Sequence, residues 1–340
     1  MKLKFWRVGT GDAITINFPD SKDRKRNIFI DGGFVGTYRH SIKPELVRIR
    51  EAGELVDLWV LTHTDRDHIG GVEAFIKDVA IADRERLVVE FWFNWSDYTF
   101  VPPTEKVSVA QGIVLREYLQ AIGKLPREEI KVTPDSIVLY DCTFAILSPD
   151  QQSLEKSKIH WQRQEHPMPV AGGRNDHEST IEELSVAPAS EDTDPFNGGS
   201  IAFLVSWRER SILLLGDSHP SVIVQSLTRL GYSPANRLRV DFVKLSHHGS
   251  KNNTSRGLIQ LLDSDNYIIL AEGSVHSLPN KWTLANILVH PERDFSRTIT
   301  FYFNYDNPRL RSIFDTDSNK DKYNFRCVFS TEPFLELDLA

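Results

Sequence analysis

The chain has few of the features that mark secreted or membrane proteins. Its 340 residues include two cysteines and two methionines, so no disulfide framework is indicated. Cys142 and Cys327 lie far apart in apolar runs and are predicted to be small buried side chains without a chemical role. No stretch approaches the roughly 20 apolar residues of a membrane span, and the start, MKLKFWRVGTGDA, lacks a signal peptide's apolar region. We therefore expect a cytoplasmic protein.

The chain also lacks an excess of positive charge. It has 40 Lys and Arg against 47 Asp and Glu, a formal net charge of -7. This balance excludes a protein coated in positive potential, so a nucleic-acid substrate would have to be held by a local basic patch or by bound metal. The hydrophobic content of 40% is enough to bury a sizeable core.

Short runs rich in Val, Ile and Phe, such as AITINF, LWVLT, SILLLGD and TITFYFNY, recur along the chain and predict buried strands. Helical patterns lie between them, so the predicted fold class is α/β. Helices are expected at 109–123, 221–232 and 281–288, and one after Gly71 whose buried face is formed by the following side chains: Val72, Phe75, Ile76 and Val79.

We expect one domain over residues 1–340. Residues 165–196 are rich in Pro, Gly, Ser and acidic side chains and predict an irregular inserted loop or flap. Residues 315–340 predict a C-terminal extension of one or two strands packed on the domain. The segment FWFNWSDYTF contains three aromatic side chains that could stack on bases, namely Trp92, Trp95 and Tyr98. We favour instead a core strand followed by the packed start of a loop.

The stretch LTHTDRDHIGGVE at residues 61–73 places an apolar strand directly before a polar cluster. Imidazole and carboxylate groups are common ligands of zinc and similar divalent ions. The four candidate ligands are His63, Asp65, Asp67 and His68. Thr64 and Arg66, which alternate with them, are expected to point away. An ordinary cap of a helix beginning near Gly70 explains one aspartate but not both histidines.

Other apolar strands also end in candidate ligands. Asp217 follows SILLLG, and His247 and His248 lie in DFVKLSHHGS. A single histidine is more often a core residue than a ligand, but three such strand ends together favour a metal site. Asp31, in FIDGG, is placed to orient a ligand histidine from behind.

The set VGTGDA, FIDGG, HTDRDHIGG, LLLGD and LSHHGS, over residues 1 to about 290, resembles the metallo-β-lactamase superfamily. Within it, the set resembles the branch that contains the metallo-hydrolase domain of bacterial competence DNA-uptake proteins. Asp65 stands where the commoner His-x-His-x-Asp-His signature has its second histidine, an exchange typical of that branch. The resemblance implies an αββα sandwich with a site for two divalent metal ions, Zn²⁺ or Mn²⁺, at one edge of its two sheets.

The resemblance also implies how the ligands divide. His63 and Asp65 would bind one ion, Asp67 and His68 the other, and Asp217 would bridge them.

One of His247 and His248 would complete the second ion's ligands, and the other would protonate the leaving group or contact substrate. The sequence leaves open which is which. Asn197 and Ser200 resemble the Asn-x-x-Ser of the competence-type branch and replace a ligand histidine of other members. Whether His276 contributes in place of a His-Pro pair is also open.

These features predict a metal-dependent hydrolase, most simply a phosphodiesterase or nuclease acting through a metal-bridged hydroxide, with Asp67, His247 and His248 in the catalytic set. DNA or RNA is the expected substrate class, and partner proteins of a multi-component system remain open. The turn GSKNN offers candidate phosphate contacts in Ser250, Lys251 and Asn252, although a solvated turn explains it equally well. The alternatives are a hydrolase of a small ester, lactone, amide or phosphocholine-type substrate, and a non-catalytic scaffold with a vestigial metal site.

Overall fold

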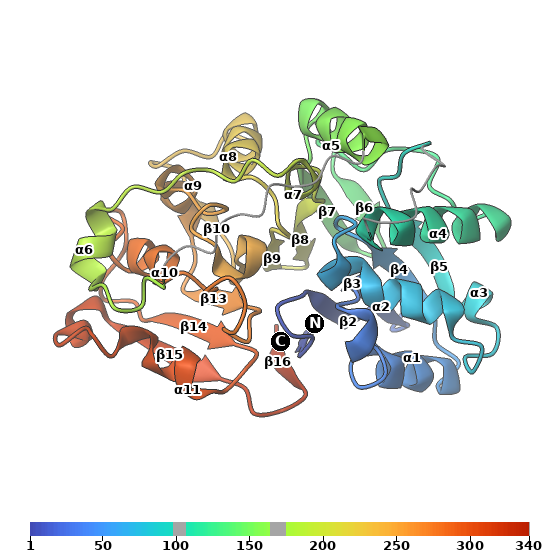
Figure 1. Cartoon of the computed structure of the whole chain (residues 1–340), viewed down its shortest axis with the longest axis horizontal. Coiled ribbons are helices and arrows are strands. Elements are labelled where there is room, and N and C mark those ends of the chain that lie inside the picture. Colours follow the sequence, from blue (N-terminus) through green and yellow to red (C-terminus); the bar gives the residue numbers. More distant parts are fainter. Residues whose placement is uncertain (98–106, 164–174, 340) are drawn as a thin grey trace.

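The computed structural model describes residues 1–97, 107–163 and 175–339, and it contains two β-sheets with helices on the outer side of each (Figure 1). The first sheet has the strand order β16-β1-β2-β3-β4-β5. Its strands are β1 (Lys2–Trp6), β2 (Ala13–Pro19), β3 (Lys25–Asp31), β4 (Val56–Val60), β5 (Val88–Trp92) and β16 (Phe334–Asp338). Strands β3, β4 and β5 run parallel, while β16, β1, β2 and β3 pair antiparallel in turn.

The second sheet has the strand order β15-β14-β13-β11-β9-β8-β7-β6. Its strands are β6 (Ile137–Leu139), β7 (Cys142–Ser148), β8 (Ala202–Trp207), β9 (Arg210–Leu214), β11 (Phe242–Lys244), β13 (Asn266–Ile269), β14 (Ile299–Phe303) and β15 (Phe325–Phe329). A short separate pair joins β10 (Leu238–Arg239) to β12 (Leu262–Asp263). The tail thus adds β15 to the second sheet and β16 to the first, which brings the two chain ends together: the Met1 amino group donates a hydrogen bond to Leu339 O.

The helices cover the outer faces of the sheets. They are α1 (Ile42–Glu51), α2 (Arg66–Lys77), α3 (Arg84–Leu87), α4 (Val107–Ala121), α5 (Gln151–Arg163), α6 (Ile181–Val186), α7 (Pro195–Gly198), α8 (Pro220–Arg229), α9 (Arg256–Leu261), α10 (Lys281–Leu288) and α11 (Pro308–Arg311). Single 3₁₀ turns are η1 (Val35–Thr37), η2 (Ser246–Gly249), η3 (Ser312–Phe314) and η4 (Lys320–Tyr323). None of the helices within the described ranges is both long and apolar enough to cross a membrane.

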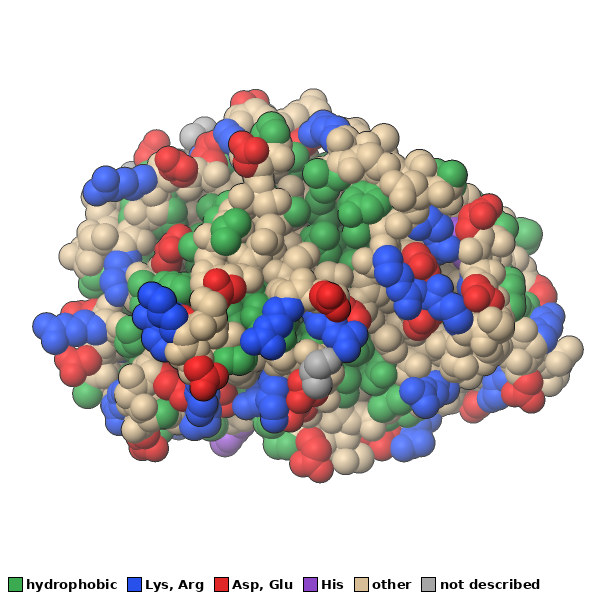
Figure 2. All heavy atoms as spheres, turned by 180° about the vertical axis from the view of Figure 1, so that it is seen from behind, with side chains coloured by type: hydrophobic (Ala, Val, Ile, Leu, Met, Phe, Trp, Pro, Cys, Tyr) green, Lys and Arg blue, Asp and Glu red, His purple; other side chains and the backbone are tan. Residues whose placement is uncertain are grey.

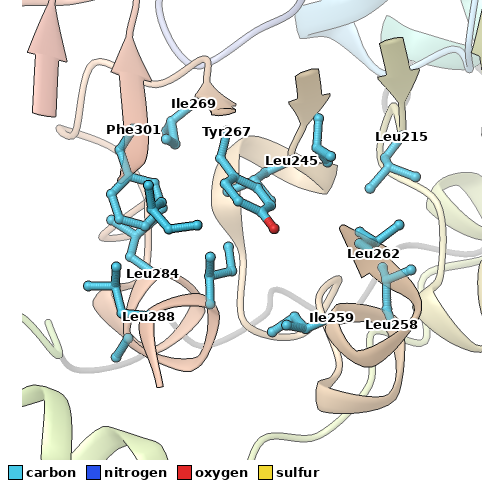
Figure 3. Packing of buried hydrophobic residues seen from close by; sticks show 14 of the residues in the cluster. Leu215, Leu245, Leu258, Ile259, Leu262, Tyr267, Ile269, Leu284, Leu288 and Phe301 are labelled. Atoms are coloured by element: carbon cyan, nitrogen blue, oxygen red, sulfur yellow. The ribbon is translucent and has the colours of Figure 1, made fainter. Parts of the chain in front are cut away.

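The core consists of three layers of apolar contact. Between the sheets, alternate side chains of facing strands meet, among them Leu3 and Phe5 of β1 and Phe203 of β8, as the period of two in a strand requires. A second cluster lies under α1, α2 and α4. Figure 3 shows the third, in which Leu284 of α10 and Leu258 of α9 face the outer side of the second sheet. The predicted α/β sandwich is therefore confirmed.

Several local predictions need correction. Helix α2 begins at Arg66, four residues before the predicted start near Gly70, and it ends at Lys77. Val79, assigned to its buried face, lies beyond the helix end and is 85% exposed. Helix α2 can lie against the turn after β3 because Gly71 has no Cβ atom. A Cβ atom at this position would overlap the backbone of Gly32.

The predicted irregular loop at 165–196 is wrong for residues 181–186, which form α6. Thr180 and Glu183 form a reciprocal capping box at its start, and Ile181 and Leu184 are buried against α10. Residues 165–174 lie outside the described part of the chain.

The cysteine and aromatic predictions fare better. Cys142 is buried between the sheets and Cys327 is half-buried, and burial raises the pKa of each thiol to about 12. Trp92 packs between the sheets and Trp95 packs against the cluster under α4. Tyr98 lies outside the described residues.

Candidate metal centre

The candidate metal centre lies where strands of both sheets end. Strands β3 and β4 are parallel neighbours in the first sheet, as are β9 and β11 in the second. Because the carboxyl ends of parallel neighbours meet at one edge, Asp31 and the turn after β4 come together, as do Asp217 and the turn after β11. The two edges meet across the sandwich at His68 Nε2, which lies 3.3 Å from Asp217 Oδ2.

Asp217 stands at the centre of the cluster and is 2% exposed. Its Oδ2 atom also lies 3.8 Å from His63 Nε2 and 3.9 Å from His247 Nε2. The backbone of Asp217 is held from behind, because the Asp217 N–H donates to Ser200 Oγ at 3.1 Å. One buried carboxylate oxygen therefore faces three imidazoles.

Hydrogen bonds at Nδ1 fix the direction of the buried imidazoles. His68 Nδ1 lies 2.8 Å from Asp31 Oδ2, and His248 Nδ1 lies 2.9 Å from Leu270 O. His63 Nδ1 lies 3.1 Å from the hydroxyl of Thr62, which itself donates to Asp31. These acceptors place the proton on Nδ1 and leave a lone pair on Nε2, the arrangement of metal-binding histidines.

The three Nε2 atoms have no hydrogen-bond partner although all are buried. Buried polar atoms are rarely left unpaired, since each costs about 1–3 kcal/mol. A cation explains them: two donors bound to one ion at about 2.1 Å with tetrahedral angles lie about 3.4 Å apart. The observed donor spacings of 3.3 to 3.8 Å fit that geometry.

Four overlapping groups of side chains have ligand atoms close enough together to hold a divalent ion, and three of them share His68, whose one free lone pair on Nε2 can bind only one ion. For two ions, the first ligand group is therefore His63 with Asp65 and Asp217, and the second ligand group is Asp67, His68 and His248. Asp65 Oδ2 lies 3.6 Å from His63 Nε2.

The structure distinguishes the roles of His247 and His248, which the sequence left open. His248 Nε2 lies 3.5 Å from Asp67 Oδ2, and the His248 side chain is 2% exposed. The His247 side chain is 30% exposed, and its Nδ1 lies 3.0 Å from Asn253 Oδ1. Both residues have left-handed backbone conformations, with φ of 45° and 57°, which turn the two rings in different directions. Only His248 belongs to the second ligand group.

Charge in the cluster is strongly coupled. Burial alone would lower the pKa of His68, but the Asp217 and Asp31 carboxylates raise it well above its ordinary value. Burial would likewise raise the pKa of Asp217, yet His68 and His247 hold it well below its usual range. For His247, Asp217 and Asp192 outweigh burial and raise the pKa to about 9. A divalent cation would take the place of these imidazole protons.

The predicted supporting residues lie close to the ligands. Asp31 is fully buried and accepts from the Thr62 N–H as well as from His68. Asn197 is buried, and its Nδ2 donates to Asp192 Oδ2 at 2.7 Å and lies 3.4 Å from His247 Nδ1.

A pocket with a volume of about 330 Å³, within the range of small-molecule sites, opens over the cluster. Its lining residues are Thr10, Phe34, Asp65, Arg66, Asp67, Asp217, His247, His248, Val275, His276 and Leu278. Arg66, predicted to point away, therefore faces the site, whereas Thr64 is buried beside Gly112. His276 also lies on the pocket wall.

The candidate phosphate contacts in GSKNN are not among the residues lining this pocket. Ser250 Oγ accepts from the Asn252 N–H, and the Lys251 N–H donates to Asn280 Oδ1. These are the hydrogen bonds of a structured turn.

Three further charged residues were not identified from the sequence. Asp192 belongs to the acidic segment and reaches His247, with Oδ2 3.8 Å from Nδ1. Asp12 and Lys244 form a buried ion pair beneath the cluster. The available signal was a lysine inside the apolar strand DFVKL, where a charged side chain needs a partner.

Comparisons with known proteins give distant matches. No family model matches the chain. The chain is 25% identical over 279 residues to ComE operon protein 3 of Bacillus subtilis (strain 168), a match that covers 78% of this chain and 27% of that protein. The chain therefore corresponds to about a quarter of that relative's length.

Solved structures with a similar arrangement are distant in sequence. The E377D mutant of CmlA β-hydroxylase has a TM-score of 0.42 and 12% identity over 99% of this chain and 54% of that chain. A long form RNase Z from yeast has a TM-score of 0.40 and 14% identity, over 99% and 41%. The metallo-β-lactamase fold protein YhfI from Bacillus subtilis has a TM-score of 0.39 and 8% identity, over 99% and 100%.

The assignment follows from the chain's own architecture and motifs. Its two sheets carry helices on their outer faces, and imidazole and carboxylate side chains from the ends of β4, β9 and β11 converge at one edge. The chain is therefore an α/β sandwich with a candidate metal centre at one edge, and its motifs resemble those of the metallo-β-lactamase superfamily.

Proposed function

We propose that the protein is a metal-dependent hydrolase that cleaves phosphodiester bonds in DNA or RNA with two divalent cations. The observation that carries this proposal is the set of unpartnered, buried Nε2 atoms of His63, His68 and His248 around the Asp217 and Asp67 carboxylates. Donor sets that mix carboxylate and imidazole suit Mn²⁺ as well as Zn²⁺.

When bound, such a cation pair supplies a hydroxide nucleophile near neutral pH and neutralises charge that develops on the phosphoryl oxygens. The protein's own groups hold the geometry. Asp31 fixes the ring of His68, and Ser200 fixes the backbone of Asp217. We assign to His247, which lines the pocket and is held by Asn253, the transfer of a proton from Nε2 to the leaving oxygen.

Arg66 supports an anionic substrate. It is exposed at the pocket wall, it is the one Lys or Arg in the lining, and no ion pair involves it within the described residues. A guanidinium binds phosphate oxygens in a bidentate manner. Figure 2 shows acidic and basic side chains interspersed on the face opposite that of Figure 1, so that face offers no broad positive surface. We therefore place phosphate recognition at the pocket.

We expect Arg66→Ala to lower kcat/KM for a phosphodiester roughly 10- to 100-fold, because a hydrogen bond to a charged group contributes about 1.5–3 kcal/mol. Arg66→Lys should recover part of the loss. Arg39→Ala, which removes an exposed arginine outside the pocket, is the matched control and should leave the rate unchanged. An equal loss with an uncharged ester substrate would argue against phosphate binding by Arg66.

The function itself is tested by incubating purified protein with labelled single- and double-stranded DNA and RNA, with Mn²⁺ or Zn²⁺ and with chelator. The proposal expects cation-dependent cleavage that is lost in the Asp67→Ala, His68→Ala double variant. Cleavage undiminished in that variant would reject these residues as its source.

One observation favours a smaller substrate. Asp192 Oδ2 lies 3.8 Å from His247 Nδ1. Burial and the nearby Asp65 carboxylate raise the pKa of Asp194. Negative charge from the 190–194 segment disfavours a long polyanion. Turnover of small esters or lactones without nucleic-acid cleavage would support this second function. Absence of bound cations after gentle purification would support a scaffold instead.

A further inference from the structure

A fully buried lysine lies beneath the metal centre. Lys244 is the last residue of β11 in the second sheet, and Asp12 directly precedes β2 in the first. Their exposed fractions are 0% and 1%, and Lys244 Nζ pairs with Asp12 Oδ2. Lys244 Nζ also lies 3.2 Å from the carbonyl oxygen of Gly216, the residue before Asp217. The pair therefore links the two sheets directly behind the candidate ligands.

The contacts of Asp12 point to one half of the site. Asp12 Oδ1 lies 3.5 Å from His248 Nδ1, and the Asp12 N–H donates to Asp67 O at 3.1 Å. A Cβ atom at Gly11 would overlap that same carbonyl oxygen, so the chain before Asp12 is pressed against α2. Asp67 and His248 belong to the second ligand group, as does His68, which has a ligand nitrogen within 4.8 Å of an Asp12 carboxylate oxygen.

We propose that Lys244 and Asp12 are positioning residues for the cation held by the second ligand group. This inference rests on the proposed function, since it assumes that the site binds cations. Lys244 neutralises Asp12 and ties it to the Gly216 carbonyl. Asp12 in turn holds the turn that carries Asp67 and lies against the ring of His248. The ion pair thereby sets the spacing between the two ligands that come from opposite sheets.

The loss of charge and the loss of positioning in Lys244→Met have opposite expected effects on cation affinity. By charge alone, removing a buried ammonium would strengthen the binding of a nearby cation. Loss of position would weaken it, and changes in groups behind metal ligands typically cost about 10- to 100-fold in affinity. We expect the second Mn²⁺ to bind about 10- to 100-fold more weakly in Lys244→Met, with the first Mn²⁺ retained. Asp12→Asn should weaken the second ion as well.

The chain contains a matched control in a second fully buried ion pair. Lys281 is 0% exposed, and its Nζ lies 2.6 Å from Asp317 Oδ2 and 2.7 Å from Ser179 O. Within the described residues, neither side chain forms a hydrogen bond or ion pair with a candidate ligand. Lys281→Met loses a comparable buried charge and should lower stability to a similar degree, yet leave both Mn²⁺ affinities unchanged.

The test is calorimetric titration of the full chain with Mn²⁺ alone, together with thermal unfolding of each variant. Selective weakening of the second ion in Lys244→Met, absent in Lys281→Met, supports the inference. Unchanged or tighter binding of the second ion overturns it. Should Lys244→Met fail to fold, the isosteric Asp12→Asn decides by the same criterion. A wild-type chain that binds no Mn²⁺ would instead refute the proposed function, and this inference with it.

Discussion

Replacing Asp217 by Ala is expected to remove high-affinity binding of both cations and to lower the hydrolytic rate at least about 1,000-fold. The reason is that one buried oxygen, Asp217 Oδ2, lies within 3.9 Å of Nε2 of His63, His68 and His247. The measurement is the number of Mn²⁺ ions bound, by titration and elemental analysis, alongside the cleavage rate.

Asp321→Ala provides the control for this substitution, because it removes an exposed carboxylate from η4. It should change neither ion count nor rate. An Asp217→Ala chain that still bound two ions would show that Asp217 does not bridge them.

Gly71→Ala is expected to destabilise the fold by about 2 kcal/mol. Alanine gains about 1 kcal/mol over glycine in a helix, but the added Cβ would overlap Gly32 O, and overpacking of this kind costs about 3 kcal/mol. Relief of the overlap must move α2, which carries Asp67 and His68 in its first turn. We therefore also expect weaker cation binding. Urea unfolding and Mn²⁺ titration measure the two effects.

Gly36→Ala is the matched control, because a Cβ atom there would have no atom within 4 Å. Its stability should stay within about 0.5 kcal/mol of the wild type. If Gly71→Ala were as stable as Gly36→Ala, the close approach of α2 to the turn after β3 would not be required for the fold.

Many strands and the helices α2, α4, α8 and α10 were predictable because each depends on a local pattern, and the same holds for the candidate ligands that directly follow apolar runs. Apolar runs gave β4, β9 and β11, and ligand side chains directly after them indicated a common edge. The predicted direction of the Arg66 side chain was wrong because the prediction continued the alternation of side chains past the end of the strand to residue 66. Helix α2 already starts at Arg66, so its side chain follows the helical period and turns into the pocket.

The choice between His247 and His248 could not be made from the sequence. The two are chemically identical, and their ring directions depend on two left-handed backbone conformations in η2. The Asp12–Lys244 pair joins residues more than 200 positions apart, one directly before β2 of the first sheet and one at the end of β11 in the second. Such a contact exists only once both sheets are packed, so no local sequence pattern predicts it.

Composition misled the prediction for residues 181–186. The segment is rich in polar and acidic residues, which favoured an irregular loop, but STIEEL carries the Thr-x-x-Glu pattern of a capping box and two apolar residues at helical spacing. A local helix signal was present and was outweighed by the composition of the wider stretch.

The central claim is that distant strand ends converge to hold two cations. An anomalous-difference map from crystals grown with Mn²⁺ tests it most directly. We predict two peaks, one among His63, Asp65 and Asp217 and one among Asp67, His68 and His248. A map without a peak at these side chains, from crystals in saturating Mn²⁺, would contradict the claim.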